Sequence, residues 1–257
     1  MTQPHDYPDH VTAAGHVAPV PRRIRGRIGA TTVFDTTRAW YFFEWPPYPQ
    51  YYVPRADVRE DVLVAPGETE RTTAGLVQSY GLRVGGVIRS AAARVVVEPS
   101  VPELADTVRF TWSALDAWYE EDEEVYVHPR NPFHRVDALR SSRSVRVELD
   151  GVVRAETSSP VLVFETGLPT RYYLDPTAVR FEHLVPSGTV TACPYKGTTG
   201  GYWSASINGR IYDDIAWSYA FALPAVGAIA GLIAFYNERV DITLDGVELP
   251  RPRSPFS

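Results

Sequence analysis

The chain places its only cysteine and its only lysine three residues apart, in Cys193-Pro-Tyr-Lys196-Gly197. Every other basic residue with a permanent charge is arginine, so Lys196 is the one side-chain amine available. An amine can bind an anionic group or act as acid or base, and Schiff-base chemistry is a further option that nothing in the sequence selects. A cysteine becomes a nucleophile when a nearby cation lowers its pKa, and Lys196 is the nearest candidate. The alternatives are a small buried cysteine and a lysine that faces water.

Glu165 is the third residue with potential chemistry. It ends the apolar run Val161-Leu-Val-Phe164 and precedes Thr-Gly-Leu-Pro. A carboxylate at the end of a buried strand is costly unless it is paired, and Arg171 or Arg180 could pair with it. Alternatively, partial burial raises its pKa and makes it a general acid or base. The predicted catalytic residues are therefore Glu165, Lys196 and Cys193.

Aromatic side chains around these residues could form the wall of an amphipathic pocket, or simply the core. The segment from His128 to Arg135, rich in His, Arg, Asn and Pro, is either an ordered connection or a contributor to the site. The predicted substrate-binding residues are Arg171, Tyr173, Tyr195, Trp203, Trp217, Tyr236, His128 and Arg130.

Several functional classes are disfavoured by motif and composition. The chain has no glycine-rich phosphate loop, no serine nucleophile elbow and no spaced Cys/His set, so we predict no cofactor and no metal. A net charge of −6 and a pI near 5.5 argue against nucleic-acid binding. The longest apolar run, 220–236, contains Pro224 and is too short for a membrane span. One cysteine and no signal peptide indicate the cytoplasm.

The sequence contains an internal repeat. The stretch from Phe43-Glu44 to Val58-Arg59 overlays that from Phe164-Glu165 to Val179-Arg180 without gaps, and a Tyr-Tyr pair coincides as well. In this overlay Cys193 falls opposite Thr72 and Lys196 opposite Gly75. The second copy therefore carries the distinctive groups.

Each copy is predicted to consist mainly of antiparallel strands with one helix that begins at a proline, followed by a closing strand. The helices are expected from Pro102 to Tyr119 and from near Pro224 to Tyr236, and the acidic run 120–124 is expected at the exposed end of the first. Asp150-Gly151 and Asn208-Gly209 predict two tight hairpins.

The expected organisation has five parts. They are a flexible tail (1–25), a divergent first repeat (26–127), an ordered connector (128–143), a second repeat that holds the candidate site (144–250) and a C-terminal tail (251–257).

The second copy resembles the DUF427 family of bacterial and fungal proteins. The resemblance covers about 144–250 and rests on the blocks 164–173, Cys193-Pro-Tyr-Lys-Gly197, Tyr202-Trp-Ser, Ala216-Trp-Ser-Tyr219 and Phe235-Tyr236. The first copy is similar but lacks the Cys-Pro-Tyr-Lys-Gly block.

This resemblance implies an Mss4-like, β-tent fold, in which two small antiparallel sheets meet at an angle, in a zinc-free version because Cys-x-x-Cys pairs are missing. The family has been labelled nucleotidyltransferase-like. The chain shows neither the Gly-Ser helix start nor the paired aspartates of such enzymes, and the resemblance assigns no function.

We therefore expect a cytoplasmic tandem protein whose second copy binds a small anionic or carbonyl-containing molecule. The expected activity is of the hydrolase, lyase or isomerase type, with Glu165 as acid/base and Lys196 and Arg171 holding an oxygen-bearing group. The alternatives are a non-catalytic ligand-binding or protein-interaction module, and a nucleotide-binding or nucleotidyltransferase-like protein. A homodimer, and one pocket shared by both copies, both remain open.

Overall fold

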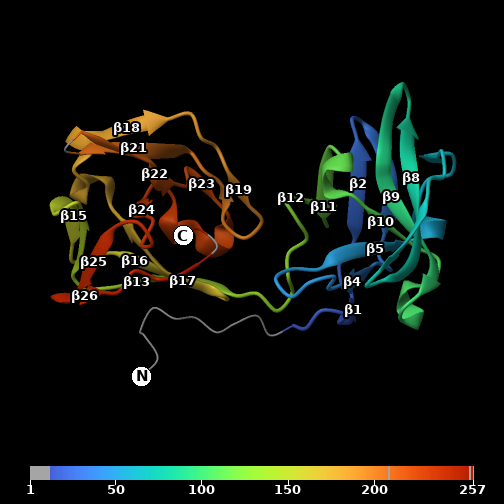
Figure 1. The fold of residues 1–257 in the computed structure, drawn as a ribbon, viewed down its shortest axis with the longest axis horizontal. Helices are drawn as coiled ribbons and strands as arrows, with labels where there is room; N and C mark the ends of the chain where they lie inside the picture. The colour runs from blue at the N-terminus through green and yellow to red at the C-terminus, as the bar shows by residue number, and fades with distance from the viewer. Residues whose placement is uncertain (1–11, 208, 255, 257) are drawn as a thin grey trace. The chain divides into compact units, whose positions relative to one another are not determined.

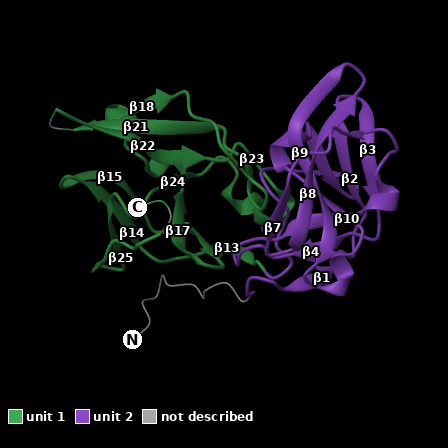
Figure 2. Ribbon diagram, turned by 45° about the vertical axis from the view of Figure 1, so that its right-hand side comes forward, with its two compact units in different colours: residues 1–9, 134–257 green, residues 10–133 purple. Residues whose placement is uncertain are grey.

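The computed structural model describes residues 12–207, 209–254 and 256, and over these the chain is built of antiparallel strands joined by short 3-10 turns (Figure 1). It divides into two compact units, residues 10–133 and 134–257, coloured purple and green in Figure 2. We refer to them as the N-terminal unit and the C-terminal unit. The boundary falls inside the segment predicted as a connector.

The N-terminal unit contains two sheets. The larger has the strand order β1-β4-β5-β10-β9-β8-β6, with β7 paired to β8, and the smaller has the order β12-β11-β2-β3. The strands are β1 Val17–Pro19, β2 Ile24–Ile28, β3 Thr31–Thr36, β4 Trp40–Phe42, β5 Gln50–Pro54, β6 Leu63–Val64, β7 Thr69–Thr72, β8 Gly75–Val84, β9 Val87–Pro99, β10 Thr107–Phe110, β11 Ala117–Glu120 and β12 Glu123–Val125.

The C-terminal unit contains a large sheet of order β13-β16-β17-β24-β22-β21-β18, a sheet β15-β14-β25-β26 and a small sheet β19-β20-β23. The strands are β13 Val136–Arg140, β14 Val145–Leu149, β15 Val152–Thr157, β16 Val161–Glu165, β17 Leu168–Leu174, β18 Leu184–Ser187, β19 Ala192–Cys193, β20 Gly197–Thr198, β21 Gly201–Ile207, β22 Arg210–Ser218, β23 Phe221–Ala222, β24 Ile233–Phe235, β25 Asp241–Leu244 and β26 Val247–Leu249.

The two units share one topology. The strand orders of the two large sheets correspond position by position, and those of the two four-stranded sheets correspond when one of them is read in reverse. The internal repeat predicted from sequence is therefore a structural repeat, and the predicted antiparallel β character is confirmed. β1 forms from part of the segment predicted as a flexible tail, whose first eleven residues lie outside the described residues.

Both predicted hairpins join strands as expected. Asp150 and Gly151 connect β14 to β15 with φ values of 50° and 70°, the left-handed conformation that a tight hairpin requires. β21 and β22 pair up to Ile207 and Arg210, with Gly209 at φ 77°. Asn208 lies outside the described residues.

The predicted helices are wrong. Between Pro102 and Tyr119 the chain forms 3-10 turns at Pro102–Leu104 and Trp112–Ala114, with β10 between them and β11 after them. Apolar residues spaced by four also fit a strand, because a period of two places every even-numbered residue on one face. Near Pro224 the chain forms a 3-10 turn, Pro224–Ile229, followed by β24. Within the described residues, no helix is longer than these six residues.

The acidic run at 120–124 is also placed differently from the prediction. Glu120 ends β11 and is buried, Glu121 lies at φ 50° in the turn, and Glu123 starts β12. A hairpin thus replaces the expected exposed helix end.

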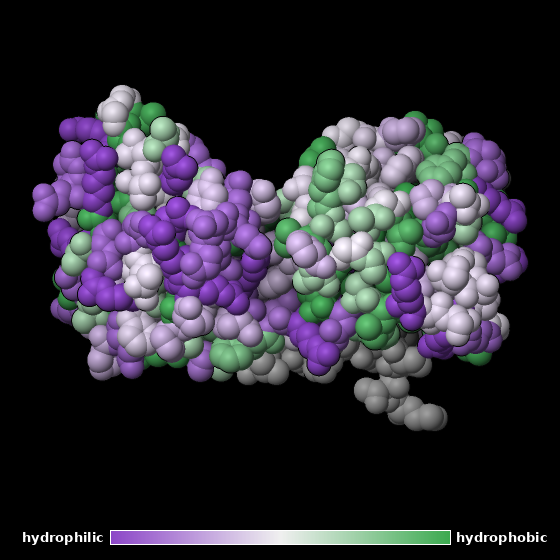
Figure 3. All heavy atoms as spheres, turned by 180° about the vertical axis from the view of Figure 1, so that it is seen from behind, coloured by the Kyte–Doolittle hydropathy of each residue, from purple (hydrophilic) through white to green (hydrophobic). Residues whose placement is uncertain are grey.

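No described helix is long and apolar enough to cross a membrane. On the face shown in Figure 3, hydrophilic residues are spread over both units between smaller hydrophobic areas.

The large sheet of the C-terminal unit is covered by core residues on both faces. Side chains alternate along β17 and β22, so Tyr172 and Ala216 join one cluster, with Val147. Tyr173 and Trp217 join another cluster, beneath the turn Pro224–Ile229. Cys193 packs against this second cluster, which therefore forms the floor of the candidate site.

Gly197, which follows Lys196, holds a conformation that disfavours a side chain. Its φ is 102°, and a Cβ atom would lie 2.5 Å from the carbonyl oxygen of Phe221 on the neighbouring strand. We expect Gly197→Ala to lower the free energy of unfolding by about 2 kcal/mol or more, measured by urea denaturation. Gly227→Ala is the control, because Gly227 has open space around it and no positive φ; equal losses in the two variants would contradict this account.

Candidate functional site

Glu165 and Lys196 form a buried ion pair in the C-terminal unit. The Lys196 ammonium donates a hydrogen bond to Oε2 of Glu165, and the two side chains are 12% and 6% exposed respectively. Glu165 is the last residue of β16, and Lys196 lies on the turn between β19 and β20. The backbone of that turn is fixed by hydrogen bonds from Lys196 N to Cys193 O at 3.3 Å and from Leu223 N to Lys196 O at 3.0 Å.

His134 completes this cluster. Its Nε2 lies 3.2 Å from Oε1 of Glu165, its ring stacks on Tyr195 at 4.1 Å between centroids, and its side chain is 7% exposed. Because the ionised Glu165 carboxylate can only accept hydrogen bonds, Nε2 of His134 is the donor, and Nδ1 is the second ring nitrogen. That Nδ1 atom is buried and has no hydrogen-bond partner in the described chain. We call Glu165, Lys196 and His134 the charged cluster.

The pKa values of the ion pair move apart. Burial alone would raise the pKa of Glu165, but the Lys196 ammonium and the hydrogen bond from His134 outweigh it and lower the pKa to about 2. Burial alone would lower the pKa of Lys196, but the Glu165 carboxylate outweighs it, so the pKa lies above its ordinary value. At neutral pH Glu165 is therefore a carboxylate and Lys196 an ammonium.

Tyr173 and Trp217 lie in the core cluster beneath the site. The Trp217 indole donates to the Tyr173 hydroxyl at 3.2 Å. Burial raises the pKa of Tyr173 to about 12, so its hydroxyl is neutral at physiological pH. Both predicted pocket residues thus belong to the same cluster as Cys193, which is a half-buried free thiol.

Arg171 does not pair with Glu165, the pairing that a purely structural role for Glu165 predicted. It forms two hydrogen bonds to the Glu238 carboxylate, at 2.6 and 2.7 Å. Its guanidinium also lies 5.7 Å from the Trp217 ring and 5.6 Å from the Tyr236 ring. Arg171 and Tyr236 therefore form a second polar group that adjoins the core cluster.

Trp203 lies on the other face of the large sheet. It packs against the cluster of Tyr172 and Ala216, and its ring meets Phe181 edge-on at 5.9 Å. Along β21 it alternates with Tyr202, which belongs to the cluster of Tyr173. The structure therefore separates Trp203 from the charged cluster.

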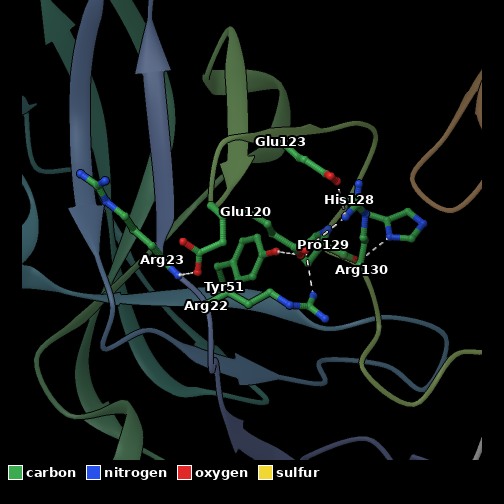
Figure 4. A network of polar contacts seen from close by, with 9 residues as sticks. Arg22, Arg23, Tyr51, Glu120, Glu123, His128, Pro129 and Arg130 are labelled. Carbon is green, nitrogen blue, oxygen red and sulfur yellow. Dashed lines mark hydrogen bonds and ion pairs between the residues drawn. The ribbon is translucent and has the colours of Figure 1, made fainter. Parts of the chain in front are cut away.

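His128 and Arg130 belong to the N-terminal unit. The His128 ring stacks on Tyr48 at 3.7 Å, and Arg130 lies 3.6 Å from Glu120 and 3.4 Å from Glu123. Figure 4 shows His128, Arg130 and Glu123 together with Glu120, which also accepts hydrogen bonds from Tyr51 and Arg22. Arg130 and its acidic partners stabilise the end of the β11–β12 hairpin in that unit.

The N-terminal unit keeps the carboxylate of the site but changes its surroundings. Tyr52 donates to Glu44 at 3.0 Å, and Arg109 lies 3.3 Å from the same oxygen. Arg109 lies on β10, and strand pairing shows that its counterpart in the C-terminal unit is Ala234 on β24. The cation that faces Glu44 thus comes from strand β10, whereas Lys196 comes from the turn between β19 and β20.

Strand pairing also corrects the sequence overlay, which put Gly75 opposite Lys196. Thr72 pairs with Gly75 in one unit and Cys193 with Gly197 in the other, so the C-terminal turn has one extra residue. Gly75 and Gly197 share positive φ values, and the carbonyls before them accept equivalent hydrogen bonds from Ser100 and Leu223. The counterpart of Lys196 is therefore Ala74 and not Gly75, whereas Thr72 does lie opposite Cys193.

A search for metal-ligand groups among the described residues finds no cluster of three or more His, Cys, Asp or Glu side chains. In the charged cluster, Lys196 contacts Oε2 of Glu165, whereas His134 contacts Oε1.

A model of a protein family described as a domain of unknown function, DUF427, matches the chain twice, over residues 16–121 and 137–246. The chain belongs to the DUF427 family. Each unit holds one match, so this is a tandem DUF427 protein, and Glu165 and Lys196 lie within the second match. A search of curated proteins finds no match to it.

Sequence reasoning did not select His134, which precedes the second DUF427 match by three residues. The available signal was the segment from His128 to Arg135, whose residue types suggested a contribution to the site. The structure assigns the two ends of that segment to different units, so only His134 contributes to the charged cluster.

Removing Lys196 tests the energetics of the ion pair. We expect Lys196→Met to lower the free energy of unfolding by about 3 kcal/mol at pH 7, because it leaves a carboxylate buried without its cation. The double variant with Glu165→Gln should recover much of this loss.

The pKa of Glu165 is lower in the folded than in the unfolded chain, so its stabilisation is present above about pH 4.5 and is lost as pH falls toward 2. The deficit of Lys196→Met should therefore shrink below about pH 4.5.

The matched control is Arg109→Met in the N-terminal unit, which removes the cation of a more exposed pair. We expect a loss of about 1 kcal/mol or less there. Urea unfolding from pH 2.5 to 8 measures all these variants. A pH-independent deficit for Lys196→Met, or no recovery in the double variant, would show that the pair does not behave as described.

Proposed function

We propose that the C-terminal unit binds a small anionic or carbonyl-containing molecule at the charged cluster and catalyses a proton transfer on it without a metal. The observation that carries this proposal is a buried ammonium whose carboxylate partner also holds a histidine with an unpartnered Nδ1. A cation to hold the substrate and a base to move a proton thus lie on either side of Glu165.

Lys196 supplies electrostatic stabilisation. Its raised pKa keeps it protonated, so in the resting protein it is an ammonium that can hold a carboxylate or polarise a carbonyl oxygen. The same shift disfavours the neutral amine that Schiff-base formation requires. Half-buried Cys193 ends β19, three residues before Lys196.

His134 is the general base in this proposal, and Glu165 positions it. The Glu165 carboxylate accepts from Nε2, which orients the ring and leaves Nδ1 to accept a proton. This differs from the role expected from sequence, in which Glu165 itself moves the proton; its pKa of about 2 makes it a weak base. Of the expected reaction types, lyase or isomerase chemistry beginning with proton abstraction next to a carbonyl needs only these groups.

The comparison between units supports a functional role for the second copy. The N-terminal unit replaces Lys196 with Ala74, although the turn keeps its backbone hydrogen bond and its positive-φ glycine. The fold of this turn therefore does not require the lysine.

A non-catalytic binding or interaction module is the second candidate. One observation favours it: Glu44 also faces a cation, Arg109, so a carboxylate–cation pair at the end of this strand accompanies the fold in both units. In that case the charged cluster would stabilise the strand end and bind a ligand without turning it over.

Two broader assignments accompany this proposal. The pairing of a large and a four-stranded antiparallel sheet in each unit supports a β-tent, Mss4-like arrangement. The single unpaired cysteine supports a reducing, cytoplasmic environment.

Alkylation of Cys193 tests whether an anion binds beside Lys196, because the chain has no other thiol to react. We expect the alkylation rate with anionic iodoacetate, divided by the rate with neutral iodoacetamide, to be several-fold higher in wild type than in Lys196→Met. The reason is that the ammonium attracts the carboxylate of iodoacetate. Pyruvate, which carries a carboxylate and a carbonyl, should protect wild-type Cys193. Rates are measured by mass spectrometry of the intact protein.

Lys196→Arg is the control that keeps the charge and should keep the preference for iodoacetate. An equal reagent ratio in wild type and Lys196→Met, or no protection by pyruvate, would contradict the binding proposal.

Exchange of the pyruvate methyl protons in D2O tests the proton-transfer step. We expect wild type to catalyse the exchange. In His134→Asn the exchange rate should fall by at least about 100-fold, the usual contribution of a general base. The exchange is followed by proton NMR. Protection of Cys193 without exchange would favour the non-catalytic module.

A further inference from the structure

A separate groove of about 270 Å³ opens on the C-terminal unit between Tyr202 and Tyr236. Thr189, Thr191, Asp214 and Arg239 also line it. We propose that this groove, the Tyr202–Tyr236 groove, binds a hydroxylated ring molecule that carries one anionic group, the chemistry of a sugar phosphate or sugar acid. The proposal goes beyond the proposed function and uses none of the residues of the charged cluster.

Asp214 is aimed by a bulge in the large sheet. It has a φ of 48°, and the register between β21 and β22 shifts beside it, between Trp203 and Ala205. The N-terminal unit has the same bulge, with Ala91 at φ 48° in β9. The bulge therefore belongs to the fold, and the C-terminal unit alone uses it to present a carboxylate.

The Asp214 carboxylate is already oriented for ligand binding. The Ser187 hydroxyl donates to one of its oxygens, and the Thr189 hydroxyl donates to the other at 2.6 Å. Two carboxylate oxygens offer about four acceptor positions, so one on each remains for a ligand. Sugar hydroxyls are donors that fit these positions.

Arg239 supplies the positive charge. It is half-buried, and no carboxylate forms an ion pair with it in the described part of the chain. A partly desolvated guanidinium is stabilised by an anion, and its fork-shaped donors match a phosphate or carboxylate. The groove thus combines a fixed acceptor with a cation that has no acidic partner among the described residues.

Aromatic rings and hydroxyls complete the recognition. The Tyr202 hydroxyl lies 3.0 Å from the Thr191 hydroxyl, and the Tyr236 ring lies 6.1 Å from Phe256, which also borders the groove. Ring faces pack against the C–H face of a sugar. Strand pairing puts Ser79 at the place of Tyr202 in the N-terminal unit, which lacks this wall.

The size of the groove limits the ligand. Pockets for drug-sized ligands have volumes of about 300–1,000 Å³. The groove, at about 270 Å³, lies just below this range, so it suits one ring with a substituent and not a dinucleotide. The combination of carboxylate, guanidinium and aromatic faces then favours a sugar phosphate or sugar acid over a simple anion.

Isothermal titration with four probes tests the proposal: glucose 6-phosphate, ribose 5-phosphate, glucuronate and inorganic phosphate. We expect at least one of the three sugar probes to bind wild type at least about tenfold more tightly than inorganic phosphate. Arg239→Met should weaken that binding by tenfold or more through loss of the charged contact. Asp214→Ala should weaken it as well, and the variant should fold because Ala91 occupies the same bulge.

Two variants serve as controls. Arg143→Met removes an exposed arginine that pairs with Asp245 and should leave binding unchanged. Lys196→Met should also leave sugar-probe binding unchanged while it loses pyruvate protection, which separates this proposal from the proposed function. Failure of all three sugar probes, equal affinity for inorganic phosphate, or unchanged binding in Arg239→Met and Asp214→Ala would each overturn the proposal.

Discussion

The buried contact between Glu165 and Lys196 constrains the whole candidate site. Removing two charges from water costs several kcal/mol for each unless they meet in good geometry, so three segments must converge. These are the end of β16, the turn between β19 and β20, and His134, which lies two residues before β13. The same contact sets the chemistry, because it keeps Lys196 protonated and Glu165 ionised and lets Glu165 orient His134.

The two units show which features belong to the DUF427 fold and which were added to one copy. Strand order, the bulge at Ala91 and Asp214, and the glycine after Ala74 and Lys196 occur in both. The lysine and the Asp214 carboxylate occur in the C-terminal unit only. The backbone therefore offers corresponding positions twice, and side-chain substitution, with one extra residue in the turn before Gly197, separates the two copies.

Sequence alone predicted the repeat and the antiparallel sheets and selected Glu165 and Lys196, which the structure brings into contact, because these rest on local patterns and rare residue types. It failed at the helices, since residues 104, 108 and 112 fit a helix and an interrupted strand equally well. It missed the contact of His134 with Glu165 and the pairing of Arg171 with Glu238, because both join residues far apart in sequence. An ungapped overlay also could not reveal the extra residue in the turn before Gly197.

The most direct test of this account is the ¹⁵N NMR signal of the Lys196 side chain. Labelling with ¹⁵N-lysine gives one side-chain signal, because the chain has no second lysine. The account predicts an ammonium that stays protonated above pH 10.5 and a signal that responds as Glu165 titrates near pH 2. Added pyruvate should shift the signal, and His134→Asn should alter it. An ammonium that titrates as an ordinary exposed lysine and ignores pyruvate would contradict the central claim that a buried ion pair organises this site.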